Sequence, residues 1–89
     1  MSMYKLRDRI LVSKIDGETV LLDLDSGKYF GLNATASAML EILVTAESRS
    51  TAISRLKERF PQAVKRIESD LEQFIAAMVS RGLLQAQAS

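Results

Sequence analysis

The spacing of hydrophobic and polar residues divides the chain into a first part with a period of two and a second part with a period of about 3.6. Residues 9–15 alternate roughly in polarity and are rich in β-branched side chains, which predicts a first strand. Asp16 and Gly17 then form a turn, and a second strand is expected over residues 19–24. The first part of the chain is therefore predicted to begin with a β-hairpin.

Val20, Leu21 and Leu22 break the alternation, because all three side chains are apolar. Two arrangements fit this run. Either both faces of the second strand are covered, or one face packs against the core while the other is partly shielded.

A second turn is predicted at Asp25, Ser26 and Gly27, because glycine accepts the positive φ that a tight hairpin needs. Residues 28–32 then form a short aromatic strand, and Asn33 is a good N-cap for a following helix. A hairpin whose last strand ends at a helix start can leave a free sheet edge beside that helix. Such an edge can hold a peptide.

The helical period predicts three helices after Asn33. The first ends near Thr45, and a polar linker over residues 46–50 offers Ser48 or Ser50 as the cap of the second. The third is expected from about Pro61 to Arg81, with Gly82 as its C-terminal stop. The apolar positions of the first two are Ala34, Ala38, Met39, Ile42 and Leu43, then Ala52, Ile53, Leu56 and Phe60.

These elements predict an α+β fold with a single domain over residues 1–89. The expected architecture is a winged-helix-like domain, in which a three-stranded antiparallel sheet is followed by a three-helix bundle. Residues 83–85 are expected to add a short extended piece. The ends, about residues 1–6 and 86–89, are expected to fray.

The third helix carries an apolar arc of roughly 140°, wider than the stripe of about 100° that one buried face requires. Two readings stay open. The arc packs entirely in the core, or the flank near Ile67, Leu71 and Phe74 is left open beside the last strand, with Asp70 on its rim. The arc consists of Val64, Ile67, Leu71, Phe74, Ile75 and Met78.

Composition narrows the chemistry, because the chain has no cysteine and no histidine. Disulfides, thiolate metal sites, the commonest general base and the commonest metal ligand are thereby excluded. Turn formation explains the acidic residues of the first part better than catalysis does. We therefore expect no enzyme activity, no metal and no cofactor. The acidic residues in question are Asp8, Asp16, Glu18, Asp23 and Asp25.

The charge balance argues against a nucleic-acid or membrane partner. Twelve basic and eleven acidic residues give a net charge of +1, and acidic residues interleave with the basic ones of the second and third helices. A DNA-binding winged helix is kept as a rival, through Arg55, Lys57, Arg59, Lys65 and Arg66. The apolar run that contains residues 76–79 is too short to span a bilayer, and the first residues lack a signal-peptide core. A soluble, cytoplasmic protein is expected.

Residues 21–36, which read LLDLDSGKYFGLNATA, closely resemble the hallmark segment of the PqqD-like proteins, also called RiPP recognition elements. The resemblance continues through the helix over residues 37–43 and the closing residues 74–84, which end in Gly82, Leu83 and Leu84. It covers about residues 10–84.

The resemblance implies a non-catalytic domain that binds the leader segment of a ribosomally made precursor peptide and presents it to modifying enzymes. In that family the leader adds as an antiparallel strand to the third strand and rests against the third helix. Carried over, the backbone edge would come from Lys28, Tyr29, Phe30, Gly31 and Leu32. The helix wall would come from Ile67, Asp70, Leu71 and Phe74.

Two pathway settings stay open. In lasso-peptide synthesis, which the wording of residues 21–30 favours, the partners are a leader peptidase and an ATP-dependent cyclase. In pyrroloquinoline quinone synthesis the partner is a radical-SAM enzyme. A scaffold that barely contacts the peptide is a further alternative. A monomer is the default, and a dimer through short exposed edges stays open.

Overall fold

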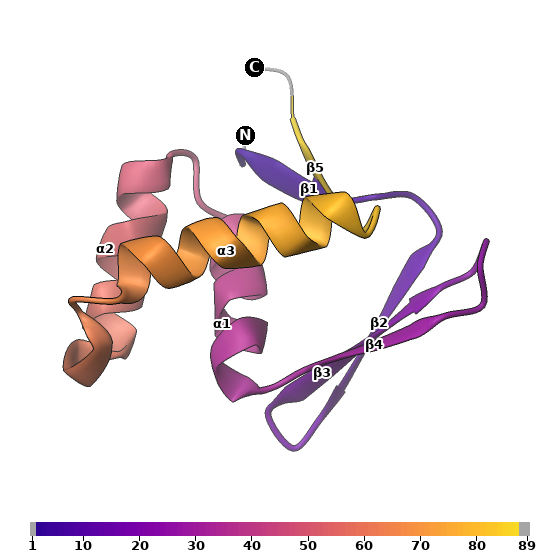
Figure 1. The fold of residues 1–89 in the computed structure, drawn as a ribbon, viewed down its shortest axis with the longest axis horizontal. Coiled ribbons are helices and arrows are strands. Elements are labelled where there is room, and N and C mark those ends of the chain that lie inside the picture. Colours follow the sequence, from indigo (N-terminus) through magenta and orange to yellow (C-terminus); the bar gives the residue numbers. More distant parts are fainter. Residues whose placement is uncertain (1, 88–89) are drawn as a thin grey trace.

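The computed structural model describes residues 2–87, which form one three-stranded sheet, one two-stranded sheet and three α-helices (Figure 1). The larger sheet is antiparallel, with strand order β2-β3-β4. The predicted winged-helix-like α+β fold is confirmed. Its elements are β2 (Ile10–Ile15), β3 (Glu18–Asp23), β4 (Tyr29–Leu32), α1 (Ala34–Leu43), α2 (Arg49–Arg59) and α3 (Ile67–Ser80).

Both predicted turns are confirmed. Asp16 and Gly17 join β2 to β3 with φ values of 52° and 82°, which is the left-handed pair that a two-residue hairpin requires. Gly27, with φ 74°, closes the turn between β3 and β4. The sequence therefore fixes the two reversals that bring three strands side by side.

The register explains the apolar run of β3. Leu21 is fully buried and pairs with Val12 and Phe30, so these three side chains share the face that packs against the helices. Val20 and Leu22 lie on the opposite face and are partly buried. One face of β3 thus packs against the core and the other is partly shielded, which was the second of the two expected arrangements.

The first two helices begin at the predicted caps. The N–H of Ala36 donates to Asn33 Oδ1 at 2.9 Å, and the N–H of Thr51 donates to Ser48 Oγ at 3.1 Å. Each bond satisfies one of the N–H groups that a helix start leaves unpaired. Of the two serines considered, Ser48 is therefore the cap of α2.

The expected start of the third helix is wrong. Pro61 opens a 3-10 helix, Pro61–Ala63, and α3 begins only at Ile67. The N–H of Arg66 donates to the C=O of Ala63, a spacing of three residues rather than four, so the α-helical ladder is not continuous here. Val64 consequently lies outside α3 and is 40% exposed instead of joining the apolar arc.

The ends of the chain are paired rather than frayed. Strand β1 (Tyr4–Leu6) runs antiparallel to β5 (Leu84–Ala86), with Lys5 opposite Gln85. The N–H of Gln87 donates to the Met3 C=O at 2.8 Å, and the Gln87 side chain donates to the Ser2 C=O. Fraying was expected over about residues 1–6 and 86–89; the structure pairs residues 4–6 with residues 84–86, while residues 1, 88 and 89 lie outside the described part.

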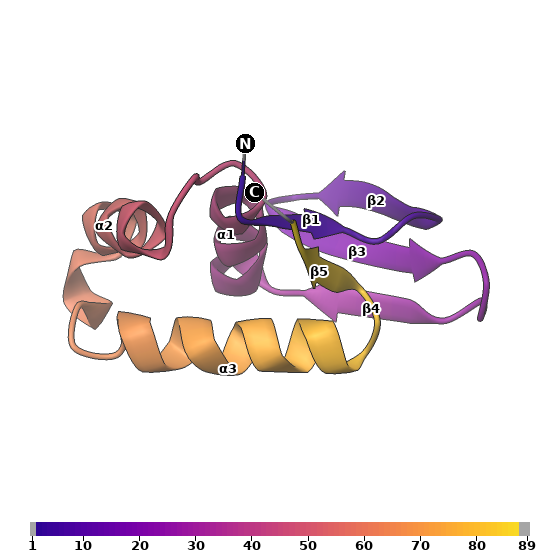
Figure 2. The ribbon, with the colours of Figure 1, turned by 90° about the horizontal axis from the view of Figure 1, so that it is seen from above.

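The core lies where α1 packs against the sheet and against the other two helices. Leu21 of β3, Leu56 of α2 and Leu71 of α3 are each fully buried in it. Viewed from above, the elements follow the order β2, β3, β4 and then α3 (Figure 2). The edge of the sheet formed by β4 therefore faces α3, whereas the edge formed by β2 faces away from it.

Candidate functional site

β4 leaves one side of its backbone open, since among the described residues no strand pairs with its outer edge. The N–H of Asp23 donates to the Lys28 C=O at 3.0 Å, so these two residues form a hydrogen-bonded pair at the hairpin end. Bonded and non-bonded pairs alternate along an antiparallel ladder. The register then directs the N–H and C=O groups of Tyr29 and Gly31 away from β3 and toward the open edge.

The predicted backbone edge is thereby narrowed to two of its five residues. Lys28, Phe30 and Leu32 belong to the hydrogen-bonded pairs with β3, so their N–H and C=O groups are directed into the sheet. An edge strand directs the backbone N–H and C=O groups of only every second residue outward. The sequence pattern alone did not show which residues of β4 these are. Tyr29 and Gly31 are the two residues that can pair with an added strand.

The side chains of β4 divide between the two faces of the sheet. Phe30 and Leu32 turn toward the helices and are largely buried. Tyr29 lies on the other face and is 71% exposed. A Cβ built on Gly31 would meet no atom within 4 Å, and a hollow of about 210 Å³ lies at this glycine and the neighbouring end of β3. The backbone around Gly31 is therefore open to close approach.

The structure buries two of the four residues predicted to form the helix wall. Ile67 and Leu71 are 1% and 0% exposed, because they point into the core between the helices. Their side chains are closed off from solvent in this structure and hold α3 in position. Asp70 is exposed and Phe74 is partly buried, so these are the two predicted wall residues that remain accessible.

A shallow cavity of about 340 Å³, widely open to solvent, lies between the first half of α3 and the start of α1. Phe74, Ala36 and Met39 give it an apolar floor, and polar groups stand around them. It directly follows the end of β4, because Asn33 is both a lining residue and the cap of α1. Its polar lining residues are Asn33, Thr35, Asp70 and Gln73.

Sequence reasoning missed several of these residues. Gln73 lies three positions after Asp70 and shares its helix face, so the i, i+3 spacing could have identified it. Thr35 and Met39 could not be found in this way, because their place in the cavity depends on how α1 crosses α3. Such a crossing depends on tertiary packing rather than on local pattern.

The hairpin that carries β4 is held by the carboxylate of Asp23. Its Oδ1 accepts hydrogen bonds from the N–H groups of Asp25 at 2.9 Å and Ser26 at 3.4 Å. The N–H of Asp25 is the main cause that lowers the pKa of Asp23 below its ordinary value, with Ser26 and the charge of Arg9 acting in the same direction. An ionised Asp23 therefore stabilises the turn that places Tyr29.

The described residues offer no metal centre, because no three His, Cys, Asp or Glu side chains among them are grouped closely enough to bind an ion. None of the helices in residues 2–87 is both long and apolar enough to cross a membrane. What the site does offer is an open strand edge, a helix with one accessible aromatic ring, and a small cavity between them.

Two solved structures are similar to this chain over nearly its whole length. The first, described as "TbiB1 in Complex with the TbiA(beta) Leader Peptide", is 29% identical, covers 96% of this chain and 99% of its own, and has a TM-score of 0.81. The second, "Lasso peptide synthetase B1 complexed with the leader peptide", is 26% identical, covers 94% and 99%, and has a TM-score of 0.82. A search of curated proteins found no match.

The family model described as "Coenzyme PQQ synthesis protein D (PqqD)" matches residues 18–84. The matched segment runs from the first residue of β3 to the first residue of β5, so it contains β4, all three helices and the cavity beside them. It extends over well more than half of the chain. The protein therefore belongs to the PqqD family and is a PqqD-like RiPP recognition element.

Proposed function

We propose that this protein binds the leader segment of a ribosomally synthesised precursor peptide and presents it to modifying enzymes. The leader adds as an antiparallel strand to β4, beside α3. The observation that carries the proposal is the pair Tyr29 and Gly31, whose N–H and C=O groups are directed outward on a strand that the cavity at Phe74 directly follows. The protein's role in this proposal is recognition rather than catalysis.

The two parts of the site divide the work of recognition. Main-chain hydrogen bonds to an added strand are indifferent to sequence, and pockets for alternate side chains supply the choice of peptide. In this protein the cavity between α1 and α3 suits an apolar or aromatic leader residue, with Asp70 and Gln73 at its rim. Ordering a flexible leader has a free-energy cost, so a few such anchors are expected to determine the affinity.

The lasso-peptide setting is favoured over the others. Both similar structures are of B1-type proteins with a leader peptide, and one is described as a lasso peptide synthetase component. In this setting the partners are a leader peptidase and an ATP-dependent cyclase. The genes beside this one test the choice, since a radical-SAM enzyme there would assign the protein to pyrroloquinoline quinone-type synthesis, which the family description supports.

No feature of the described residues favours the DNA-binding rival. Arg59 pairs with Glu41 and Arg49 with Glu72, so part of the positive charge on α2 is neutralised within the domain. Arg55 donates to Thr45 Oγ1 at 2.9 Å. Phosphate binding depends on free Lys and Arg side chains, and α2 offers few of them.

Peptide binding is tested by fluorescence anisotropy with a labelled leader peptide, taken from the precursor gene next to this one. We expect saturable binding that is lost when the same residues are scrambled. Equal binding of the scrambled peptide, or no binding to protein shown to be folded by circular dichroism, would contradict the proposal.

Strand addition is tested by Gly31→Pro with Gly31→Ala as the matched control. Proline removes an outward N–H and leaves the bonds between β3 and β4 in place, while alanine retains the N–H and meets no atom within 4 Å. Leaving a peptide carbonyl unpaired costs about 1–3 kcal/mol, so we expect the proline variant to bind about tenfold more weakly or worse. Equal affinity of the two folded variants would show that β4 is not where the peptide adds.

A further inference from the structure

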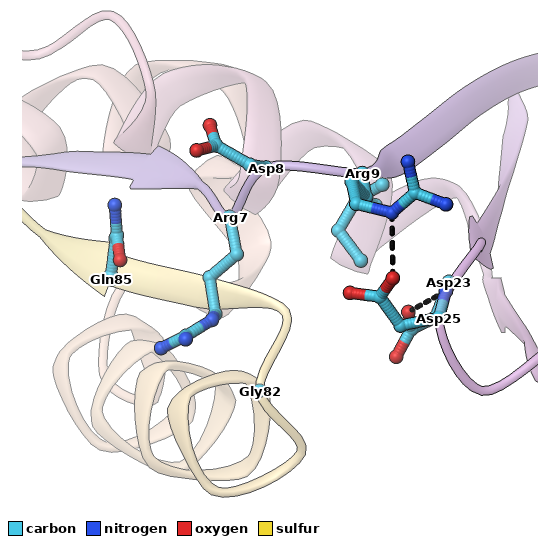
Figure 3. A pocket seen from close by; sticks show the side chains of 8 residues that line it. Arg7, Asp8, Arg9, Asp23, Asp25, Gly82 and Gln85 are labelled. Carbon is cyan, nitrogen blue, oxygen red and sulfur yellow. Dashed lines mark hydrogen bonds and ion pairs between the residues drawn. The ribbon is translucent and has the colours of Figure 1, made fainter.

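A cavity of about 550 Å³ lies at the end of the larger sheet where β2 begins and β3 ends (Figure 3). One wall is the β3–β4 hairpin, through Asp23 and Asp25, and another is Gly82 at the end of α3. The connection between β1 and β2 supplies the third wall, with Arg7 and Arg9. The cavity thus lies at the hairpin end of the sheet, which is the end toward which a strand antiparallel to β4 would run.

Most charges around this cavity already have partners. Arg9 Nε donates to Asp25 Oδ1 at 2.6 Å, and the Asp23 carboxylate accepts two N–H groups of its own turn. The carboxylate of Asp8 points away from Arg7 in Figure 3. The charged groups at the hairpin wall are therefore engaged within the protein.

Arg7 differs from these groups. Its side chain crosses β5 with the guanidinium turned away from Asp23 and Asp25, and it has no ion pair or hydrogen bond with any residue in the described range 2–87 (Figure 3). Its backbone is fixed, because the Arg7 N–H donates to the Leu83 C=O at 3.0 Å. A cation on an anchored backbone, facing a cavity without a partner, is suited to bind an external carboxylate.

The direction of an added strand leads to this cavity. A peptide antiparallel to β4 runs from the Asn33 end to the Tyr29 end and leaves beside the hairpin. A helix rises about 1.5 Å per residue, so roughly 12 Å of axis separate Phe74 from Gly82. An extended peptide spans that length in about four residues, and the reach of the Arg7 side chain adds about one or two more.

We propose that Arg7 binds an acidic residue of the leader peptide in this cavity, about four to six residues C-terminal to the residue that fills the cavity at Phe74. The inference rests on the proposed function, because it takes the direction of the peptide from strand addition to β4. This contact would make the affinity depend on a negative charge in the leader peptide, in addition to the shape and apolar contacts of the cavity at Phe74.

The test measures the affinity of the labelled leader for Arg7→Ala and Arg7→Glu, with Lys5→Glu as the control. Lys5 lies on β1, is exposed and lines none of the cavities described above, so its reversal changes the net charge equally. Exposed ion pairs contribute little, and we expect Arg7→Ala to weaken binding about two- to fivefold. Arg7→Glu should weaken leader binding further, and Lys5→Glu should weaken it by less than half as much as Arg7→Glu does.

The same peptide with its acidic residue replaced by Lys should bind the wild type more weakly and Arg7→Glu more strongly than the unaltered peptide does. Unchanged affinity of both Arg7 variants overturns the inference, as does a loss that Lys5→Glu reproduces. In either case Gly31→Pro still reports on strand addition, so failure of the Arg7 contact and failure of the proposed function give different results.

Discussion

The sheet has two open edges, and they differ in what surrounds them. β2 extends over six residues and β4 over four, and within the described residues neither has a partner on its outer side. The Leu24 N–H donates to the Arg9 C=O, so alternation directs the backbone groups of Ile10, Val12 and Lys14 outward from β2. By length alone, β2 offers more main-chain hydrogen bonds than β4.

The surroundings reverse that ranking. β4 lies on the α3 side of the sheet, and the cavity between α1 and α3 directly follows its last residue, so a side chain of an added strand has a defined place to lie. In the part of the chain that the structure describes, no helix lies beyond β2 (Figure 2), and Leu11 and Ile15 on this strand are 53% and 60% exposed. Lys14 on the same strand pairs with Glu41 of α1. An edge becomes a specific site through the walls beside it rather than through the number of its free backbone groups.

The largest effect is expected from removing the support beneath the wall of β4. Leu71→Ala opens a cavity at a fully buried position, which costs about 2–5 kcal/mol of unfolding free energy. Val79→Ala on the same helix, where the side chain is 47% exposed, should cost well below that. Urea denaturation measures both, and similar losses would show that α3 is not anchored through Leu71.

A proline on the other edge tests the comparison directly. Val12→Pro removes an outward N–H from β2, as Gly31→Pro does from β4. We expect the leader peptide to bind Val12→Pro within about twofold of wild type, against about tenfold weaker binding for Gly31→Pro. A comparable loss in the two folded proteins would mean that the peptide uses β2 as well.

The smallest effect concerns the turn that holds β4. The pKa of Asp23 is lowered in the folded protein from its ordinary value of 3.8, so its ionised form stabilises the fold at higher pH. That contribution is lost as the pH falls below 3.8 through the folded-state pKa. Asp23→Asn should therefore lower the unfolding free energy slightly at pH 7 and flatten its acid limb, so that the two proteins become alike as the pH falls through the folded-state pKa. An unaltered acid limb would contradict the role given to the carboxylate.

Local chemistry made the strands, turns and helix caps predictable. Gly17 and Gly27 mark positive φ, and Asn33 marks a helix start; each depends on neighbours within four residues. The start of α3 was not predictable in this way. A 3-10 helix without a side-chain cap begins at Pro61, although the apolar spacing of the sequence looks like one continuous α-helix from this residue onward.

The site was predictable as a place but not residue by residue. Apolar period places Ile67, Leu71 and Phe74 on one face of α3, yet only packing decides that the first two are buried and the third lines a cavity. In the same way, the register of β4 against β3 decides which of its backbone N–H and C=O groups point outward, and this cannot be seen in the sequence of the strand. The sequence pattern did not identify Arg7 as a candidate binding residue, because the cavity that it lines is formed by segments far apart in the sequence.

The pairing of β1 with β5 sets an order of events during folding. Both hairpins of the larger sheet and the contacts between successive helices form between segments that are close in the chain, whereas β1 and β5 come from its two ends. Contacts between distant segments carry the larger loop-closure entropy and form late. β1 is thus synthesised before every other strand and paired after all of them. We expect its amide protons to exchange with solvent earlier than those of β3.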